Sequence, residues 1–188
     1  FDKNKESLKM RGGIGYYILA FLNFICKIYL TIIRGTPVVV QLMIAYFIVF
    51  VSAKDGVPVG MLAFGINSGA YVAEIFRAGI QSIDKGQFEA GRSLGLTWSQ
   101  TMRKIVIPQA FRRTIPQLGN EFIAMLKDSS LVSVIGFEEL TRKGQLIIAA
   151  TYKSFEIWTA VAIIYLVMTL TISRFVAFLE KKYNSKGN

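Results

Sequence analysis

Histidine is absent from this 188-residue chain, and cysteine occurs once, as Cys26. A protein zinc site needs several His or Cys ligands, and a Ser-His-Asp or Cys-His nucleophile needs an imidazole. The sequence therefore offers no zinc site and no hydrolase centre of these kinds. A single cysteine cannot form an internal disulfide, which excludes a disulfide-stapled secreted scaffold.

Charge is also scarce: 18% of residues are charged and 53% are hydrophobic, with a mean hydropathy of +0.44. This composition excludes a disordered chain. The 22 Lys and Arg against 12 Asp and Glu give a net charge of +10. A nucleic-acid binder clusters such charge around a recognition motif. Here it concentrates in residues 1–13, 77–116 and 174–188, which favours a signal of membrane topology over nucleic-acid binding.

Three runs contain no charged residue, namely 35–53, 56–73 and 157–173, and Phe175–Leu179 extend the last one past Arg174. Each run has about the 17–25 residues that a membrane-spanning helix needs. A domain of this size has no core large enough to bury three such helices. We therefore interpret the chain as a multi-pass membrane protein.

Two further segments mix apolar and charged residues. Residues 14–33 contain Lys27, and residues 117–136 contain Glu121, Lys127 and Asp128. A charge inside a spanning helix is costly and usually faces a cavity or a partner. Each segment is alternatively an amphipathic helix that lies in the membrane interface.

The positive-inside bias orders these segments. It places the basic loop 77–116 and the basic tail, and hence the C-terminus, in the cytoplasm. Two spans must then separate them, which assigns 117–136 as a span together with 157–179. For 14–33 we favour an interfacial helix on the cytoplasmic face over a first span, because a span would place the basic residues of 1–13 outside.

The cytoplasmic loop 77–116 contains a helical segment with small side chains that begins at Glu89-Ala90-Gly91. Few bulky side chains allow another surface to approach the backbone closely. Pro108 and Pro116 are predicted to break the helix twice and to return the chain to the membrane. The loop therefore reads either as a basic segment held near anionic lipid headgroups or as a docking element for a protein partner.

The order of residues in this loop resembles the EAA signature of binding-protein-dependent ABC transporter permeases. Its spacing is kept in Glu89, Ala90, Gly91, Gly95, Ile105, Ile107 and Pro108, with Gly91 where the family often has Ala and Ile107 where it has Leu. Flanking motifs resemble the polar amino acid (histidine, glutamine and arginine type) branch; they are Arg34-Gly35-Thr36-Pro37, residues 67–79 and residues 127–131. The resemblance covers about residues 22–182.

The resemblance implies an all-α integral membrane protein with the type I, MetI-like permease core and about four to five transmembrane helices. We expect an N-terminal basic segment with an interfacial helix or first span at 1–34. The transmembrane domain follows at 35–182 with the loop 77–116, and a cytoplasmic tail at 183–188. A first span is expected before Arg34, so it is either missing from this sequence or replaced by 14–33.

No G-x-x-x-x-G-K-[ST] phosphate loop occurs, so the chain itself is not expected to hydrolyse ATP or to carry a cofactor. The resemblance implies that ATP and Mg²⁺ are bound by a separate cytoplasmic ATPase dimer. It further implies a second permease subunit, identical or related, an extracytoplasmic amino-acid-binding protein and a bacterial cytoplasmic membrane. The residues expected to couple to the ATPase are Glu89, Ala90, Gly91, Ser93, Leu94 and Gly95.

The expected substrate path for a polar L-amino acid consists of polar residues inside the spans. Asn67, Tyr71 and Glu74 share one helix face by their i, i+4, i+7 spacing. The candidate residues are Asn67, Ser68, Tyr71, Glu74, Glu121, Lys127, Asp128, Ser129 and Ser130. The alternative is that these charges neutralise one another or brace two subunits.

Three other functions stay open on the residues alone. They are a permease for another small solute of the same ABC family, an ATP-independent channel or transporter, and a membrane sensor or scaffold. The channel has no need of a loop with EAA spacing. The sensor has no need of charges inside 117–136.

Overall fold

The structure is a computed structural model that describes residues 14–53 and 55–184. All regular elements in these residues are helices, and no strand occurs among them. The basic segment 1–13 and the final residues 185–188 lie outside the described residues. In chain order the helices are α2 (Ile14–Gly35), α3 (Val38–Ile44), the π-helix η1 (Ala45–Val49), α4 (Gly56–Gln81), α5 (Lys85–Ser93), α6 (Trp98–Thr101), the π-helix η2 (Met102–Val106), α7 (Ile107–Asp128), the 3-10 helix η3 (Ser129–Ile135), α8 (Leu140–Thr151) and α9 (Ser154–Asn184).

The charge-free run 35–53 does not form one helix. Pro37 lies between α2 and α3 with φ −64° and ψ 136°, an extended conformation. Its ring also disfavours a helical conformation of the preceding residue, so α2 ends at Gly35. The seven residues of α3 and five of η1 rise about 18 Å, well short of the ~30 Å hydrocarbon core. The prediction of a continuous span over 35–53 is therefore wrong.

The helix α2 has the length that α3 lacks. It is 22 residues long, with a mean hydropathy of 1.8. Among the described residues, three helices are long and apolar enough to cross a membrane: α2, α4 and the Ser154–Lys182 part of α9. The α2 helix packs against α4. The Tyr29 hydroxyl donates a hydrogen bond of 2.5 Å to the Ile66 carbonyl oxygen. This packing favours the first-span alternative for 14–34 over the interfacial helix.

One helical stretch runs without a break from Trp98 to Ile135 through α6, η2, α7 and η3. Both prolines that were predicted to end the helix lie within it, so that prediction is wrong. Pro108 occupies the first turn of α7 and Pro116 lies inside that helix. A proline ring removes one backbone hydrogen bond, and the π-turn η2 directly before Pro108 lies where such a bond is lost.

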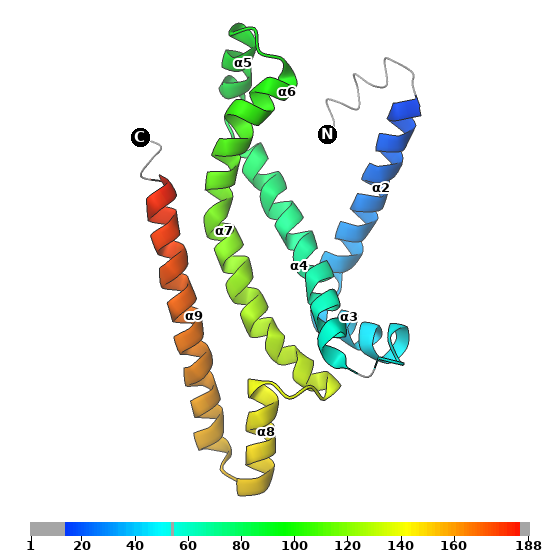
Figure 1. Cartoon of the computed structure of the whole chain (residues 1–188), viewed down its shortest axis with the longest axis vertical. Coiled ribbons are helices and arrows are strands. Elements are labelled where there is room, and N and C mark those ends of the chain that lie inside the picture. The colour runs from blue at the N-terminus through cyan, green and yellow to red at the C-terminus, as the bar shows by residue number, and fades with distance from the viewer. Residues whose placement is uncertain (1–13, 54, 185–188) are drawn as a thin grey trace.

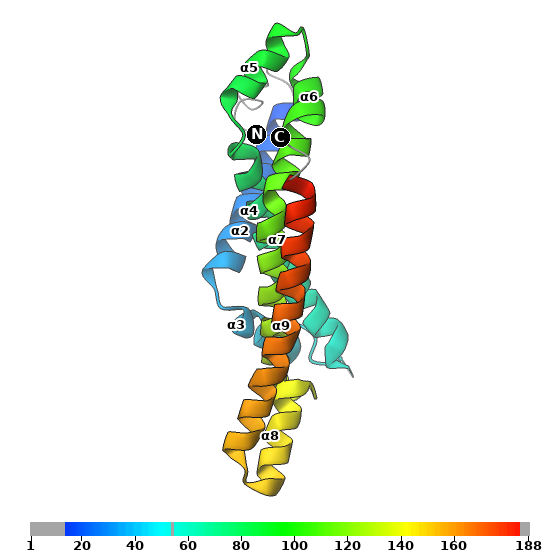
Figure 2. The same cartoon turned by 90° about the vertical axis from the view of Figure 1, so that its left-hand side faces the viewer.

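The molecule is elongated, with α5 and α6 at one end and α8 at the other (Figure 1). We call these the α5–α6 end and the α8 end. The α7 helix packs against both α4 and α9 and runs from the first end toward the second. The α9 helix returns toward the α5–α6 end, and α8 lies along its first half (Figure 2).

Two small apolar clusters join α4 to the segments on either side of it in the chain. Leu42, Ala63 and Ile135 join α3, α4 and η3. A second cluster joins the turn after α4 to η2 and α7, and it consists of Ile83, Val106 and Ala110. Beside the second cluster, a Cβ atom on Gly79 would lie 2.3 Å from Thr114 Cγ2, so only glycine allows α4 and α7 to approach this closely.

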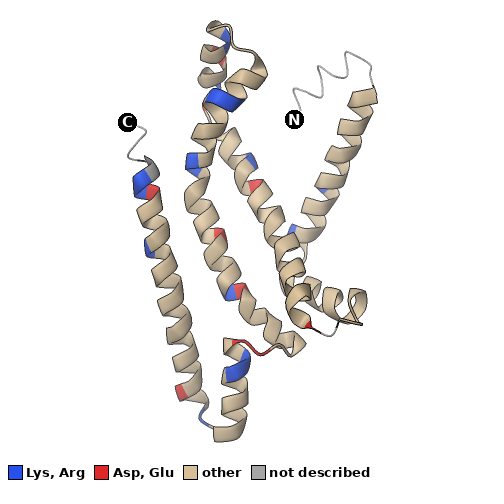
Figure 3. Cartoon of the chain, in the orientation of Figure 1, with Lys and Arg blue, Asp and Glu red and all other residues tan. Residues whose placement is uncertain are grey.

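Most of the apolar surface remains outside these clusters. No residue of α2 is buried, and Phe21 and Phe178 are each 62% exposed. Long stretches of α2, α4 and α9 carry no charge (Figure 3). An apolar surface of this extent indicates that lipid or a partner chain surrounds these helices.

Candidate functional site

At the α5–α6 end, α5 is a short helix with a defined cap at each end. The Asp84 carboxylate accepts a hydrogen bond of 2.6 Å from the Gly86 N–H at the helix start. At the other end, the Leu96 N–H donates to the Gly91 carbonyl oxygen and the Gly95 N–H to that of Arg92. These two bonds form a Schellman motif, which requires a left-handed residue that glycine provides best, and Gly95 has φ +75°.

The predicted coupling residues lie on this capped helix and its following turn. Glu89 and Ala90 are exposed, and Leu94 is 77% exposed at the tip. The Ser93 hydroxyl donates a hydrogen bond of 3.0 Å to the Glu89 carbonyl oxygen within the helix. The helix α5 therefore presents a carboxylate and a large apolar side chain to any surface that approaches this end.

Gly91 is the buried contact point of α5. A Cβ atom at Gly91 would lie 2.6 Å from Cγ2 and 2.7 Å from Oγ1 of Thr101. Thr101 is 1% exposed, and its hydroxyl has no hydrogen-bond partner among the described residues. The alanine that the resembled family often carries at this position would therefore collide with Thr101.

Polar contacts and the second apolar cluster connect α5 to the long helices. The Gln109 amide donates a hydrogen bond of 3.1 Å to the Gln87 side-chain oxygen. Arg113 Nη1 on α7 donates a hydrogen bond of 2.5 Å to the Ser82 carbonyl oxygen at the end of α4. The α5 helix is thus bonded to α7, and α7 is bonded in turn to the end of α4.

A second group of polar residues lies along the face of α4 that meets α2 and α3. Asn67 Nδ2 donates a hydrogen bond of 3.0 Å to Gln41 Oε1 on α3. Gln41 Nε2 in turn donates to the Ile33 carbonyl oxygen and to Thr36 Oγ1, each at 2.8 Å. These bonds satisfy backbone and side-chain groups at the break between α2 and α3, where the helical ladder is interrupted.

The same face of α4 continues into a cluster of charged residues. The Arg34 guanidinium, at the end of α2, lies 5.7 Å from the centroid of the Tyr71 ring and 3.6 Å from Glu74 Oε2. Arg77 Nε donates a hydrogen bond of 2.8 Å to Glu74 Oε2, and its Nη2 donates to the other carboxylate oxygen. Arg77 Nη1 also donates to Gln81.

The structure thus brings Asn67, Tyr71 and Glu74 together on one face of α4, while Ser68 is 8% exposed. Among the described residues, no hydrogen bond or ion pair joins this group to the candidates on α7 and η3, although α7 packs against α4. Glu121 and Asp128 are half-buried, and Lys127 is exposed.

The two serines that follow Asp128 are engaged within their own helix. The Ser129 hydroxyl donates to the Leu126 carbonyl oxygen, and the Ser130 carbonyl oxygen accepts from the Ser133 hydroxyl, each at 2.7 Å. The roles of all these residues in a substrate path stay predictions.

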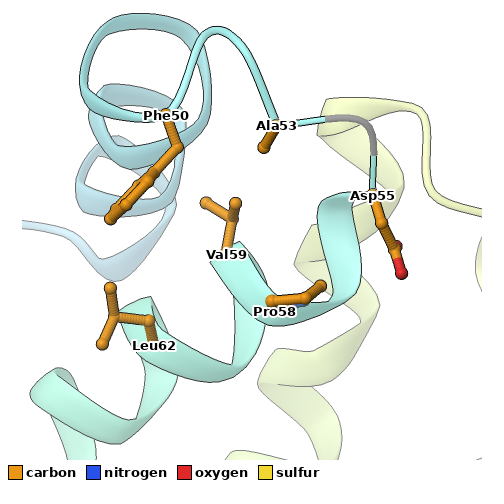
Figure 4. A pocket seen from close by; sticks show the side chains of 6 residues that line it. All are labelled: Phe50, Ala53, Asp55, Pro58, Val59 and Leu62. Carbon is orange, nitrogen blue, oxygen red and sulfur yellow. The ribbon is translucent and has the colours of Figure 1, made fainter.

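A depression of about 490 Å³ lies between the end of η1 and the start of α4 (Figure 4). Its lining is apolar except for Asp55, which caps α4 by accepting a hydrogen bond of 2.9 Å from the Val57 N–H. Asp55 is therefore the one charged side chain among the described residues of this lining, and one of its carboxylate oxygens serves the helix cap. No group of three metal-ligating side chains gathers anywhere in residues 14–53 and 55–184.

Comparison with known proteins identifies the architecture. A family model described as "Binding-protein-dependent transport system inner membrane component" matches residues 12–185. The chain belongs to this permease family. The permease is 44% identical over 164 residues to the glutamine transport system permease protein GlnP of Escherichia coli strain K12. The aligned region covers 85% of this chain and 75% of GlnP. The permease is 40% identical over 164 residues to the L-cystine transport system permease protein TcyB of Bacillus subtilis strain 168, with coverages of 86% and 70%.

Solved structures agree with the fold. The permease matches the crystal structure of an amino acid ABC transporter with histidines at a TM-score of 0.78 and 49% identity, over 83% of this chain and 74% of the other. It matches an inward-facing MetNI methionine ABC transporter at a TM-score of 0.67 over 89% and 75%, where 19% identity shows the fold alone. The predicted all-helical, MetI-like ABC permease fold is confirmed, and the permease is an inner-membrane, multi-pass transport subunit.

Sequence reasoning missed three residues where α4 meets α2 and α3: Arg34 on α2, Gln41 on α3 and Arg77 on α4. Each carried a signal. Arg34 opens the Arg-Gly-Thr-Pro motif, Gln41 is the polar residue that follows the apolar Val38–Val40, and Arg77 stands one turn after Glu74. Residues three apart on a helix are neighbours, so the pairing of Arg77 with Glu74 was accessible from the sequence.

Proposed function

We propose that the permease carries polar L-amino acids into the bacterial cytoplasm by alternating access, driven by a separate ATPase dimer that docks on α5. The α5–α6 end, with the C-terminus of α9, then faces the cytoplasm. The α8 end faces the extracytoplasmic binding protein. The names of the relatives, which are a glutamine and a cystine transport permease, support an amino acid as the substrate.

The observation that carries this proposal is the exposed tip of α5. Leu94 is 77% exposed and Trp98, at the start of α6, is 52% exposed, so two large apolar side chains lie open at this end, outside the helices of spanning length. Apolar side chains exposed together are typical of a surface that a partner covers. Burial of a leucine side chain contributes about 1.5–3 kcal/mol. An ATPase groove that takes up Leu94 gains affinity from that burial and, through the contacts of α5, moves the long helices.

In this proposal the permease works as one of a pair, identical or related. Two ATPases closing on ATP push the two α5 helices, and the α4–α7 pairs move as rigid bodies so that the substrate path opens to one side at a time. The extensive exposed apolar faces of α2, α4 and α9 support contact with lipid and with the second permease.

Leu94→Arg tests the docking. Loss of the buried leucine and introduction of a charge are expected to weaken binding of the ATPase to the purified permease by about tenfold or more. Amino-acid-stimulated ATP hydrolysis in proteoliposomes should fall with it. Tyr152→Arg is the matched control, because Tyr152 is 89% exposed at the α8 end and far from α5.

Unchanged ATPase binding by Leu94→Arg would refute the docking of the ATPase on α5. A loss of ATPase binding in Tyr152→Arg would place the ATPase at the wrong end of the molecule. If no amino acid of a panel of glutamine, histidine, arginine and cystine stimulates ATP hydrolysis in the complete system, the proposed substrate class fails.

A further inference from the structure

The charged cluster at the α2–α4 contact has an excess of positive charge. Arg34 and Arg77 both approach the single carboxylate of Glu74. Arg77 engages both oxygens of that carboxylate by hydrogen bonds. Arg34 Nη1 is 3.6 Å from Oε2, beyond the range of a good hydrogen bond. Glu74 is therefore neutralised by its own helix neighbour, and one positive charge is left over.

The guanidinium of Arg34 keeps its hydrogen-bond donors available. Its contacts within residues 14–53 and 55–184 are the ion pair with Glu74 and the Tyr71 ring. The Arg34 side chain is 41% exposed and Tyr71 is 37% exposed, so both can be reached from outside the chain. Glu74 lies seven residues before the end of α4, a helix of spanning length, where an excess positive charge is costly.

A planar guanidinium with free N–H groups matches a carboxylate, which it binds through two parallel hydrogen bonds. Every free amino acid carries one α-carboxylate. We infer that Arg34 is the residue that binds the α-carboxylate of the transported amino acid, with the Tyr71 ring as a wall of that subsite. The inference rests on the proposed function, and it gives Glu74, a predicted substrate-path residue, the role of an ion-pair partner for Arg34 and Arg77.

The subsite makes opposite predictions for the two sides of the ion pair. In Arg34→Gln the carboxylate loses its charged donor, so binding of amino acid should weaken by about tenfold or more. In Glu74→Gln the competing anion is removed from Arg34, so binding should become tighter. Arg34→Lys keeps the positive charge but lacks the planar guanidinium that makes two parallel hydrogen bonds. Its affinity for the amino acid should lie between those of wild type and Arg34→Gln.

The experiment measures binding of radiolabelled L-glutamine and L-arginine to the detergent-solubilised permease–ATPase complex without a binding protein. Competition by the corresponding L-amino acid amides, which lack the carboxylate, is measured in parallel. Wild type should prefer the acid to the amide, and Arg34→Gln should lose this preference. Arg174→Gln on α9 removes an exposed arginine elsewhere and should change neither quantity.

Three results overturn the inference. If Arg34→Gln and Glu74→Gln weaken binding alike, the pair is a structural brace. If Arg34→Gln still prefers the amino acid to its amide, another group binds the carboxylate. If the variant instead loses co-purified phosphatidylglycerol while amino acid binding is unchanged, the anion is a lipid headgroup.

The outcomes separate this inference from the proposed function. If the wild-type complex binds no amino acid and shows no amino-acid-stimulated ATP hydrolysis, the proposed function itself is refuted. If the wild-type complex binds amino acid and Arg34→Gln binds it equally well, only the carboxylate subsite at Arg34 is refuted. If Arg34→Gln does not assemble, Arg34→Lys and Glu74→Gln still give the sign of the effect.

Discussion

Gly91→Ala probes the packing beneath the proposed docking helix. The new Cβ atom would lie 2.6 Å from Thr101 Cγ2 and 2.7 Å from its Oγ1. Thr101 is 1% exposed, so protein encloses it and a shift of its side chain would displace neighbouring atoms. Alanine has the higher helix propensity, so the substitution gains up to about 1 kcal/mol from the backbone and loses more from the collision.

The size of the loss follows from overpacking. One extra carbon in a filled site typically costs about 1–3 kcal/mol. Gly65→Ala in α4 is the matched control, because nothing lies within 4 Å of a Cβ atom there. The two variants share the backbone gain, so the free energy of unfolding of Gly91→Ala should lie about 1–3 kcal/mol below that of Gly65→Ala. For a chain of this length each kcal/mol corresponds to about 2–4 °C in melting temperature.

Thermal unfolding of the purified permease measures the difference, and Thr101→Ala provides the second side of a double-mutant cycle. Thr101→Ala removes both atoms that collide, together with a hydroxyl that makes no hydrogen bond. The double variant should recover at least about 1 kcal/mol relative to the sum of the single variants. The packing argument is refuted if Gly91→Ala melts like Gly65→Ala and Thr101→Ala does not change its behaviour.

Two further predictions concern the two ends of the molecule. Arg113→Ala removes the hydrogen bond to the Ser82 carbonyl oxygen, so it should reduce uptake per ATP hydrolysed while ATPase binding persists; an unchanged transport ratio would show that this bond does not transmit movement. At the α8 end, a hydrogen bond from Lys143 lowers the pKa of Glu138 below its usual value. A carboxylate with a depressed folded-state pKa stabilises the fold at neutral pH and loses that contribution as the pH falls below about 4.3. In Lys143→Gln, the melting temperature should therefore fall less steeply with decreasing pH below about 4.3. The difference should be small, because both side chains are exposed. A melting temperature that depends on pH in the same way in wild type and variant would contradict the pairing.

The helices themselves were largely predictable from the sequence. Charge-free runs of spanning length located α4 and α9, and the EAA spacing located α5. The break after α2 was also encoded, since Pro37 disfavours a helix through the preceding residue. The uninterrupted charge-free run concealed it, because hydropathy records burial in lipid and not backbone continuity. Pro116 misled in the opposite direction, since a long packed helix tolerates one lost hydrogen bond.

The candidate site was predictable only on the α4 side. The spacing of Asn67, Tyr71 and Glu74 defines one helix face whatever surrounds it. Which helix covers that face depends on the crossing of α2 over α4, and no local pattern contains this. The partners Arg34 and Gln41 were therefore missed. The collision of Thr101 with any side chain at position 91 is likewise a contact between two elements, invisible in either one alone.

In the proposed function, the uninterrupted helical stretch from Trp98 to Ile135 would act as a lever. Its 38 residues extend about 57 Å at 1.5 Å per residue. If it pivots near the α5–α6 end, a tilt of about 6° would displace the far tip by about 6 Å. If the proposed ATPases dock on α5, a small movement at that end would therefore produce a displacement of several ångströms at the α8 end.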